Sequence, residues 1–167
     1  MDQQNKMKEK FLNLVEMHQG IIHKILSIYT YNPEDRKDLL QEIMLQLWKS
    51  FPTFQEKAAF STWMYKVALN TALLHKRRKM KEKYTVETLI KTRTMQLGIG
   101  KNDITISLYM AIDQLGPIDK AIALLYLEQK SYQEIENILG MKKSNIGVRI
   151  SRIKDKLKKI FEYEQEL

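Results

Sequence analysis

The sequence predicts an all-α protein made of two small helical domains joined by a flexible linker, and the C-terminal domain contains a helix-turn-helix. Leu, Lys, Glu, Gln and Met dominate a chain of 167 residues with only 6 Gly and 3 Pro, which is a helix-forming composition. Apolar residues recur at three- and four-residue spacing, and β-branched residues do not alternate as they do in strands. We expect the domains to cover residues 1–83 and 105–167, with the linker at 84–104.

Three helices are expected in the N-terminal domain. The first spans about residues 8–29, where apolar residues repeat at helical spacing. The second begins at Asn32 and Pro33, because asparagine caps a helix and proline suits its first position. Pro52 ends that helix. After a loop, the third helix is expected over about residues 61–83, and it ends in a basic run.

The stretch after the N-terminal domain has little periodicity. Residues 84–103 contain two glycines, and we interpret them as the linker, with a helical turn in its first half. A helix is then expected over about residues 105–115. Another helix begins at Pro117, because proline has no N–H to leave unpaired in the first turn. These two helices lead into the last motif of the chain.

The last motif is a helix-turn-helix. Ser131 and Glu134 are spaced as a capping box, in which each side chain binds a free backbone N–H of the other residue. Gly140 ends this helix, because glycine accepts positive φ without strain. A second helix, beginning near Ser144, carries isoleucines on one side and cations elsewhere. Such a helix is shaped to enter the major groove of DNA.

The net charge of +8 is concentrated in two blocks. Residues 66–93 hold nine basic and two acidic side chains, and residues 142–159 hold eight basic and one acidic. Two separate basic blocks indicate two contacts with one polyanion, with affinity supplied largely by counterion release. The alternative for either block is a solvated helix face.

Several function classes are excluded by what the sequence lacks. Without Cys there is no disulfide and no thiolate zinc site, which fits a cytoplasmic location. No apolar run reaches the roughly 20 residues of a membrane span, and the polar first ten residues are unlike a signal peptide, so no direct membrane insertion is expected. Since no phosphate loop, catalytic serine elbow or metal-spaced carboxylates appear, we expect no catalytic residues, no metal, no cofactor and no enzymatic activity.

Two stretches resemble the bacterial RNA polymerase sigma factors of the extracytoplasmic-function (ECF) group. Sigma region two is similar to DRKDLLQEIMLQLWKSF followed by FSTWMYKVALNTALLHKRRK. Sigma region four is similar to LGPIDKAIALLYLEQKSYQEIENILGMKKSNIGVRISRIKDKLKKI. The resemblance implies a protein that binds core polymerase and directs promoter recognition and transcription initiation. It also implies an anti-sigma factor as a partner.

The resemblance also assigns roles to residues. Docking on the polymerase clamp is implied for Asp38, Gln41 and Glu42. Capture of the minus-ten promoter element is implied for Phe54, Phe60, Trp63, Lys66, Asn70, His75, Arg77 and Arg78. Contact with the minus-thirty-five element is implied for Lys142, Lys143, Ser144, Asn145, Arg149, Arg152 and Lys154.

Within these sets, a few residues stand out. Asn70 is the best candidate for minus-ten specificity, although Leu74 replaces an aspartate that the family often has four residues later. Phe60 and Trp63 are expected to be mainly core residues. If the hydroxyl of Ser144 caps its helix, Asn145 and Arg149 become the main base readers. These two and Asn70 are the sequence-specific contacts we expect.

Two other functions remain open at this point. The first is a helix-turn-helix repressor with a dimerising N-terminal half, which would bind a palindromic duplex without polymerase. A sigma factor would instead bind free duplex poorly and recognise an asymmetric bipartite sequence. The second is a helical nucleic-acid enzyme, for which the sequence offers no catalytic set.

Overall fold

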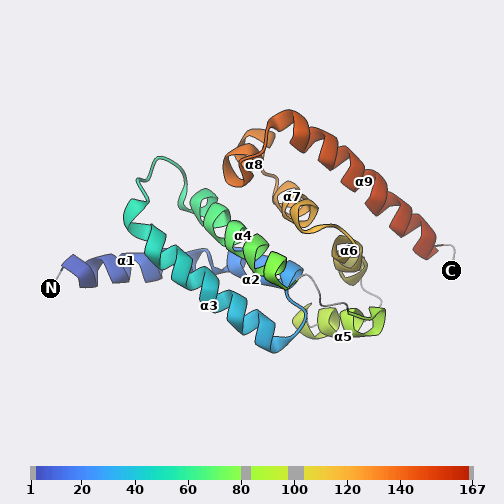
Figure 1. Ribbon diagram of the computed structural model, residues 1–167, viewed down its shortest axis with the longest axis horizontal. Helices are drawn as coiled ribbons and strands as arrows, with labels where there is room; N and C mark the ends of the chain where they lie inside the picture. The colour runs from blue at the N-terminus through green and yellow to red at the C-terminus, as the bar shows by residue number, and fades with distance from the viewer. Residues whose placement is uncertain (1–2, 80–83, 98–103, 166–167) are drawn as a thin grey trace. The chain divides into compact units, whose positions relative to one another are not determined.

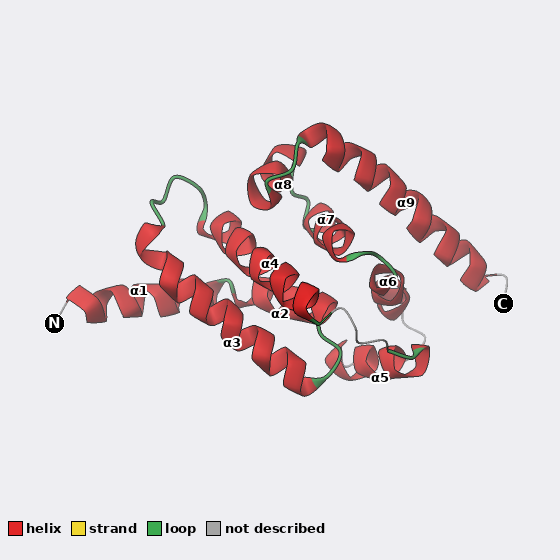
Figure 2. Ribbon diagram, viewed as in Figure 1, coloured by secondary structure: helices red, strands yellow, loops and turns green. Residues whose placement is uncertain are grey.

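The computed structural model describes residues 3–79, 84–97 and 104–165. Over these residues helices are joined by loops and no strand is present, which confirms the predicted all-α class (Figure 2). The chain divides into two compact units, Met1–His75 and Lys76–Leu167. None of the helices within the described ranges has the length and apolar character needed to cross a membrane.

The first unit is built from four α-helices and one 3-10 turn (Figure 1). They are α1 (Gln3–Met17), α2 (Gln19–Tyr29), α3 (Pro33–Ser50), the 3-10 turn η1 (Phe51–Thr53) and α4 (Phe60–Arg78). The helix expected over residues 8–29 is therefore two helices, and it begins earlier than predicted. The break lies at His18, whose N–H reaches the carbonyl of Val15 at 3.1 Å and so leaves the α-helical pattern.

The start of α3 is as predicted. The Asn32 side chain accepts a hydrogen bond from the N–H of Asp35 at 2.8 Å, and Pro33 occupies the first turn. Glu34 and Asp35 place acids near the positive end of the helix dipole. Helix α4 begins one residue before the predicted Ser61, and the predicted extension to residue 83 lies outside the described residues.

A cluster of aromatic rings joins the helices of the first unit. Phe51 lies at its centre, with ring centroids 5.2 Å from Phe11 of α1 and 6.2 Å from Trp63 of α4. Trp48 of α3 contacts Phe11 edge-to-face at 5.1 Å. Such pairs add roughly 0.5–1.5 kcal/mol each beyond the burial of their area. The cluster therefore holds the loop between α3 and α4 against both helices.

The second unit contains the remaining five helices. They are α5 (Val86–Leu97), α6 (Ile104–Asp113), α7 (Pro117–Leu127), α8 (Tyr132–Leu139) and α9 (Lys143–Gln165). Helices α7, α8 and α9 pack on one another, and α5 packs on α6 (Figure 1). The buried residues Ile135, Ile146 and Ile150 supply the core between α8 and α9. This arrangement confirms the helix-turn-helix.

The turn between α8 and α9 is formed by the predicted signals. Ser131 Oγ accepts from the Glu134 N–H at 3.1 Å, and Glu134 Oε2 accepts from the Ser131 N–H at 2.7 Å. The hydrogen bond from the Ser131 backbone lowers the pKa of Glu134, which keeps its carboxylate ionised. Gly140 adopts φ of 69°, the left-handed conformation that ends a helix at little cost for glycine.

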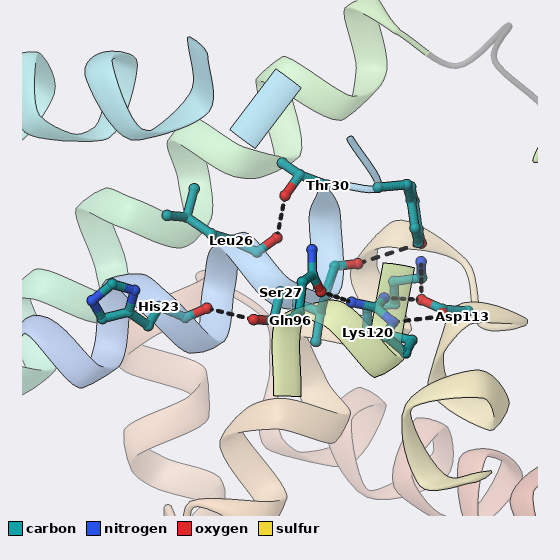
Figure 3. A network of polar contacts seen from close by, with 10 residues as sticks. His23, Leu26, Ser27, Thr30, Gln96, Asp113 and Lys120 are labelled. Atoms are coloured by element: carbon teal, nitrogen blue, oxygen red, sulfur yellow. Dashed lines mark hydrogen bonds and ion pairs between the residues drawn. The ribbon is translucent and has the colours of Figure 1, made fainter. Parts of the chain in front are cut away.

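Helix α5 corrects the linker prediction, because residues expected to hold at most one turn form three turns of helix. The side chain of Arg93, in this helix, is fully buried. Arg93 Nε donates to Asp113 Oδ2 at 3.0 Å, its Nη2 donates to Asp113 Oδ1, and its Nη1 donates to Gln96 at 2.8 Å. Figure 3 shows Gln96, Asp113 and the nearby Lys120 in this network. Helix α5 is thus attached to α6 through charge rather than through an apolar stripe.

Candidate nucleic-acid interface

Three of the predicted minus-ten residues share one exposed face of α4. Lys66, Asn70 and Arg77 are exposed, and spacings of four and eleven residues return to the same side of an α-helix. Leu74 lies near this face and is 58% exposed, so the position that departs from the family pattern points to solvent. Arg78 is exposed on the last turn of the same helix. Together they form an amide and cationic strip that suits phosphates and base edges.

The aromatic residues of the minus-ten set are packed against one another. Phe60 is only 8% exposed, and its ring centroid lies 5.2 Å from Trp63 and 5.6 Å from Phe54. Phe60 is therefore a core residue, as expected, and its contact with DNA stays a prediction. Phe54 and Trp63 are half-buried, with centroids 5.1 Å apart, and they keep part of each ring in solvent.

His75 is the other buried member of the minus-ten set. Its side chain is buried at 2% relative exposure, and its assignment to DNA stays a prediction. Its Nε2 lies 2.6 Å from Asp35 Oδ1, and its Nδ1 lies 3.1 Å from Glu42 Oε1. Asp35 was not among the predicted site residues. No local signal could have found this contact, because the two residues are 40 positions apart.

The predicted docking residues lie on one side of α3. Asp38, Gln41 and Glu42 are three and four residues apart, which is the spacing of neighbours on a helix surface. Asp38 and Gln41 are exposed, whereas the Glu42 carboxylate is 35% exposed and faces His75. The face is acidic and polar, and His75 of α4 contacts the Glu42 carboxylate.

The predicted minus-thirty-five residues surround the start of α9. Lys142, Lys143, Ser144 and Asn145 are all exposed there. The first helical hydrogen bond runs from the N–H of Ile146 to the carbonyl of Lys142 at 3.1 Å, which makes Lys142 the cap position. Ser144 therefore lies inside the helix and does not cap α9. Its hydroxyl is exposed beside Asn145.

Farther along α9, two cations of this set have partners within their own unit. Arg149 Nη1 donates to Asp119 Oδ1 of α7 at 2.6 Å, so its guanidinium would have to leave this ion pair to contact a base. This geometry does not support Arg149 as a main base reader. The Lys154 ammonium lies 4.7 Å from the Tyr126 ring centroid, and hydrogen bonding to Tyr126 raises the pKa of Lys154. Arg152, one turn after Arg149 on the same helix, is exposed.

Comparison with known families matches both halves of the chain. The family model described as Sigma-70 region 2 matches residues 14–82, and the one described as Sigma-70, region 4 matches residues 105–157. The first contains α4 and the α3 face, and the second contains the helix-turn-helix. The residues singled out for both DNA elements therefore lie inside the matched segments.

Curated relatives match over most of their own length. The ECF RNA polymerase sigma factor SigW of Bacillus subtilis is 25% identical over 166 residues, covering 91% of this chain and 89% of that protein. The ECF RNA polymerase sigma-E factor of Haemophilus influenzae is 26% identical over 162 residues, covering 89% and 85%. Both alignments run through the two sigma regions.

Two solved structures share the fold of this chain. The sigma factor RpoE of Bartonella quintana, crystallised with the anti-sigma factor NepR, matches with a TM-score of 0.66 at 17% identity over 94% of this chain and 97% of that chain. CnrH, solved in complex with the cytosolic domain of CnrY, matches with a TM-score of 0.64 at 16% identity over 93% and 90%. The chain belongs to the sigma-70 family, as an RNA polymerase sigma factor of the extracytoplasmic-function type that acts in promoter recognition and transcription initiation.

Proposed function

We propose that this sigma factor divides promoter recognition between its two halves. Residues 1–83 would dock on core polymerase through α3 and capture the minus-ten element through α4. Residues 105–167 would read the minus-thirty-five element through the start of α9. The observation that carries the proposal is that each half presents an exposed polar and cationic helix face inside a matched sigma region. The protein would supply start-site choice and no catalysis of its own.

The start of α9 has the chemistry needed to read bases. Residues in the first turn of a recognition helix reach base edges, and later cations hold phosphates. Lys143 and Asn145 are exposed in this turn, whereas Arg149 is paired with Asp119. We therefore assign base contacts to Lys143 and Asn145 and a phosphate contact to Arg152.

Strand capture by the first half requires platforms for unstacked bases. The exposed parts of Phe54 and Trp63 lie beside the start of α4 and could stack one base each, at roughly 1–3 kcal/mol per base. Asn70 would supply hydrogen bonds to a base edge, and Lys66 and Arg77 would hold the backbone. These cations lie on the strip of α4 described above.

An anti-sigma factor is the second partner that we propose. The relatives RpoE and CnrH were solved with NepR and with the cytosolic domain of CnrY, respectively. By analogy, this protein would be held inactive in the cytoplasm by a partner of that class until a signal releases it. The contacts between α3 and polymerase would then form.

The docking assignment predicts a large loss of polymerase affinity on charge reversal. Asp38→Arg combined with Glu42→Arg should weaken binding to purified bacterial core polymerase by about 100-fold, because two cations would face a basic partner at an interface where lost charge pairs cost roughly 2–5 kcal/mol. Fluorescence anisotropy of the labelled protein measures this. The matched control is Glu16→Arg, an exposed acid of α1, which should bind as the wild type does. Equal affinity of the double variant and the wild type would refute docking through this face.

The assignments on α9 predict two different defects in promoter binding. Asn145→Ala in the holoenzyme should relax preference at one base pair by about 1–3 kcal/mol, whereas Arg152→Ala should weaken all promoters similarly and reduce the salt slope by about one. Electrophoretic mobility shifts on single-substituted promoters, repeated at several salt concentrations, separate the two. Ser151→Ala, at an exposed position of the same helix, should change neither quantity. A uniform loss for Asn145→Ala would remove its role as a base reader.

A further inference from the structure

His75 lies between two carboxylates that are about two turns apart on another helix. It projects from α4, and Asp35 and Glu42 both project from α3, seven residues apart. The distances are 2.6 Å from Nε2 to Asp35 and 3.1 Å from Nδ1 to Glu42. The side chains of His75 and Asp35 are 3% and 7% exposed, so water does not separate these groups. Both ring nitrogens thus face an acceptor.

The two contacts fix the orientation of this ring. Each imidazole nitrogen can take part in one hydrogen bond, as donor or as acceptor, and here each nitrogen faces a carboxylate oxygen. The Glu42 carboxylate is therefore held against α4 at one end of the ring, and Asp35 holds the other end.

We propose that His75 is a positioning residue for polymerase docking. It fixes the carboxylate of Glu42 on the docking face of α3, and it joins that face to α4, the helix that carries Asn70 and Arg77. The proposal rests on the docking role given to Glu42 under the proposed function. A carboxylate already held in one rotamer loses less side-chain entropy when a partner binds. His75 therefore links α3, which is proposed to contact polymerase, to α4, which is proposed to contact DNA.

The contacts of the ring can be tested in the free full-length protein without polymerase. Nitrogen-15 NMR of the imidazole rings should show an N–H proton of His75 that exchanges slowly with water, because the ring is buried and hydrogen-bonded. The chain has three histidines, and the signals of His75 are those absent from His75→Asn. Rapid exchange of this proton with water would overturn the proposal.

The positioning role is tested by a double-mutant cycle on core-polymerase affinity. His75→Asn should weaken binding about three- to ten-fold in the wild-type background and have no further effect in Glu42→Ala. Independent, multiplicative losses would overturn positioning through Glu42. If Glu42→Ala weakens polymerase binding and His75→Asn does not, the positioning role of His75 fails and the docking role of Glu42 stands. If Glu42→Ala binds as tightly as wild type, the docking role fails and positioning fails with it, whatever the NMR spectrum shows.

Discussion

Replacing Asp113 with asparagine is expected to cost about 3–5 kcal/mol of unfolding free energy in the second unit, because it leaves two buried cations without an anion. Asp113 accepts from both Nε and Nη2 of Arg93 and lies 3.7 Å from the Lys120 ammonium. The side chains of all three residues are at most 5% exposed. Water therefore cannot replace the lost carboxylate, and the cost of the substitution approaches that of a broken buried ion pair.

The two units can be followed separately in this experiment. Both tryptophans of the chain, Trp48 and Trp63, lie in the first unit, so their fluorescence reports its unfolding. Hydrogen exchange of the amides of α6 and α7 reports the second unit. Asp113→Asn should abolish most of the protection there. The control is Asp155→Asn, the same chemical change at an exposed position of α9, which should alter protection by less than about 0.5 kcal/mol. A loss below about 1 kcal/mol for Asp113→Asn would show that the cluster is solvated.

The helices that the sequence predicted well begin and end with local signals. The bonds of Asn32 to Asp35 and of Ser131 to Glu134 span three residues, so the pattern of letters contains the whole interaction. Gly140 acts through its own φ. The same holds for the exposed cations of α4 and α9, because a charged side chain without a buried partner stays in solvent wherever its helix lies.

Helix α5 was missed for the opposite reason. The buried residue of this helix is Arg93, and a search for hydrophobic periodicity treats arginine as polar. Burial of Arg93 depends on Asp113, twenty residues away and beyond the intervening residues that lack periodicity. A long-range charge pair leaves no period in the sequence, so composition and spacing could not reveal this helix.

The partners of two candidate site residues were not predicted, for the same reason. His75 was assigned to DNA because it lies in a basic run, yet its partners Asp35 and Glu42 are 40 and 33 residues away. Arg149 was assigned to base reading, and its partner Asp119 is 30 residues away. In each case a titratable side chain was placed on the correct helix but paired inside its unit. Sequence alone defines the face of a helix more reliably than it defines which charges on that face are already occupied.

Lys120 is the residue of the buried cluster whose charge is the most costly. Burial lowers its pKa to about 8 from 10.5, and the attraction of Asp113 only partly opposes this effect. Asp113 is already paired with Arg93, so the three side chains carry one excess positive charge. Below pH 8 both the folded and the unfolded protein hold the proton. The folded state then bears the full cost of about 3 kcal/mol that corresponds to this difference in pKa.

Lys120→Met should therefore stabilise the second unit at pH 7, by about 1–3 kcal/mol, since methionine fills a similar volume and Asp113 keeps its contacts with Arg93. Between pH 8 and 10.5 the unfolded wild type binds more protons at this residue than the folded one, so wild-type stability rises with pH in that interval. The difference in unfolding free energy between Lys120→Met and the wild type should therefore shrink from pH 7 to pH 9.5. Urea unfolding, monitored by hydrogen exchange of the α7 amides, measures this difference. Groups common to both proteins cancel in this difference. The control is Lys91→Met, at an exposed position of α5, which should change the stability at pH 7 by less than about 0.5 kcal/mol. An advantage of Lys120→Met that stays constant or grows with pH would mean that Lys120 is not held at a cost by burial.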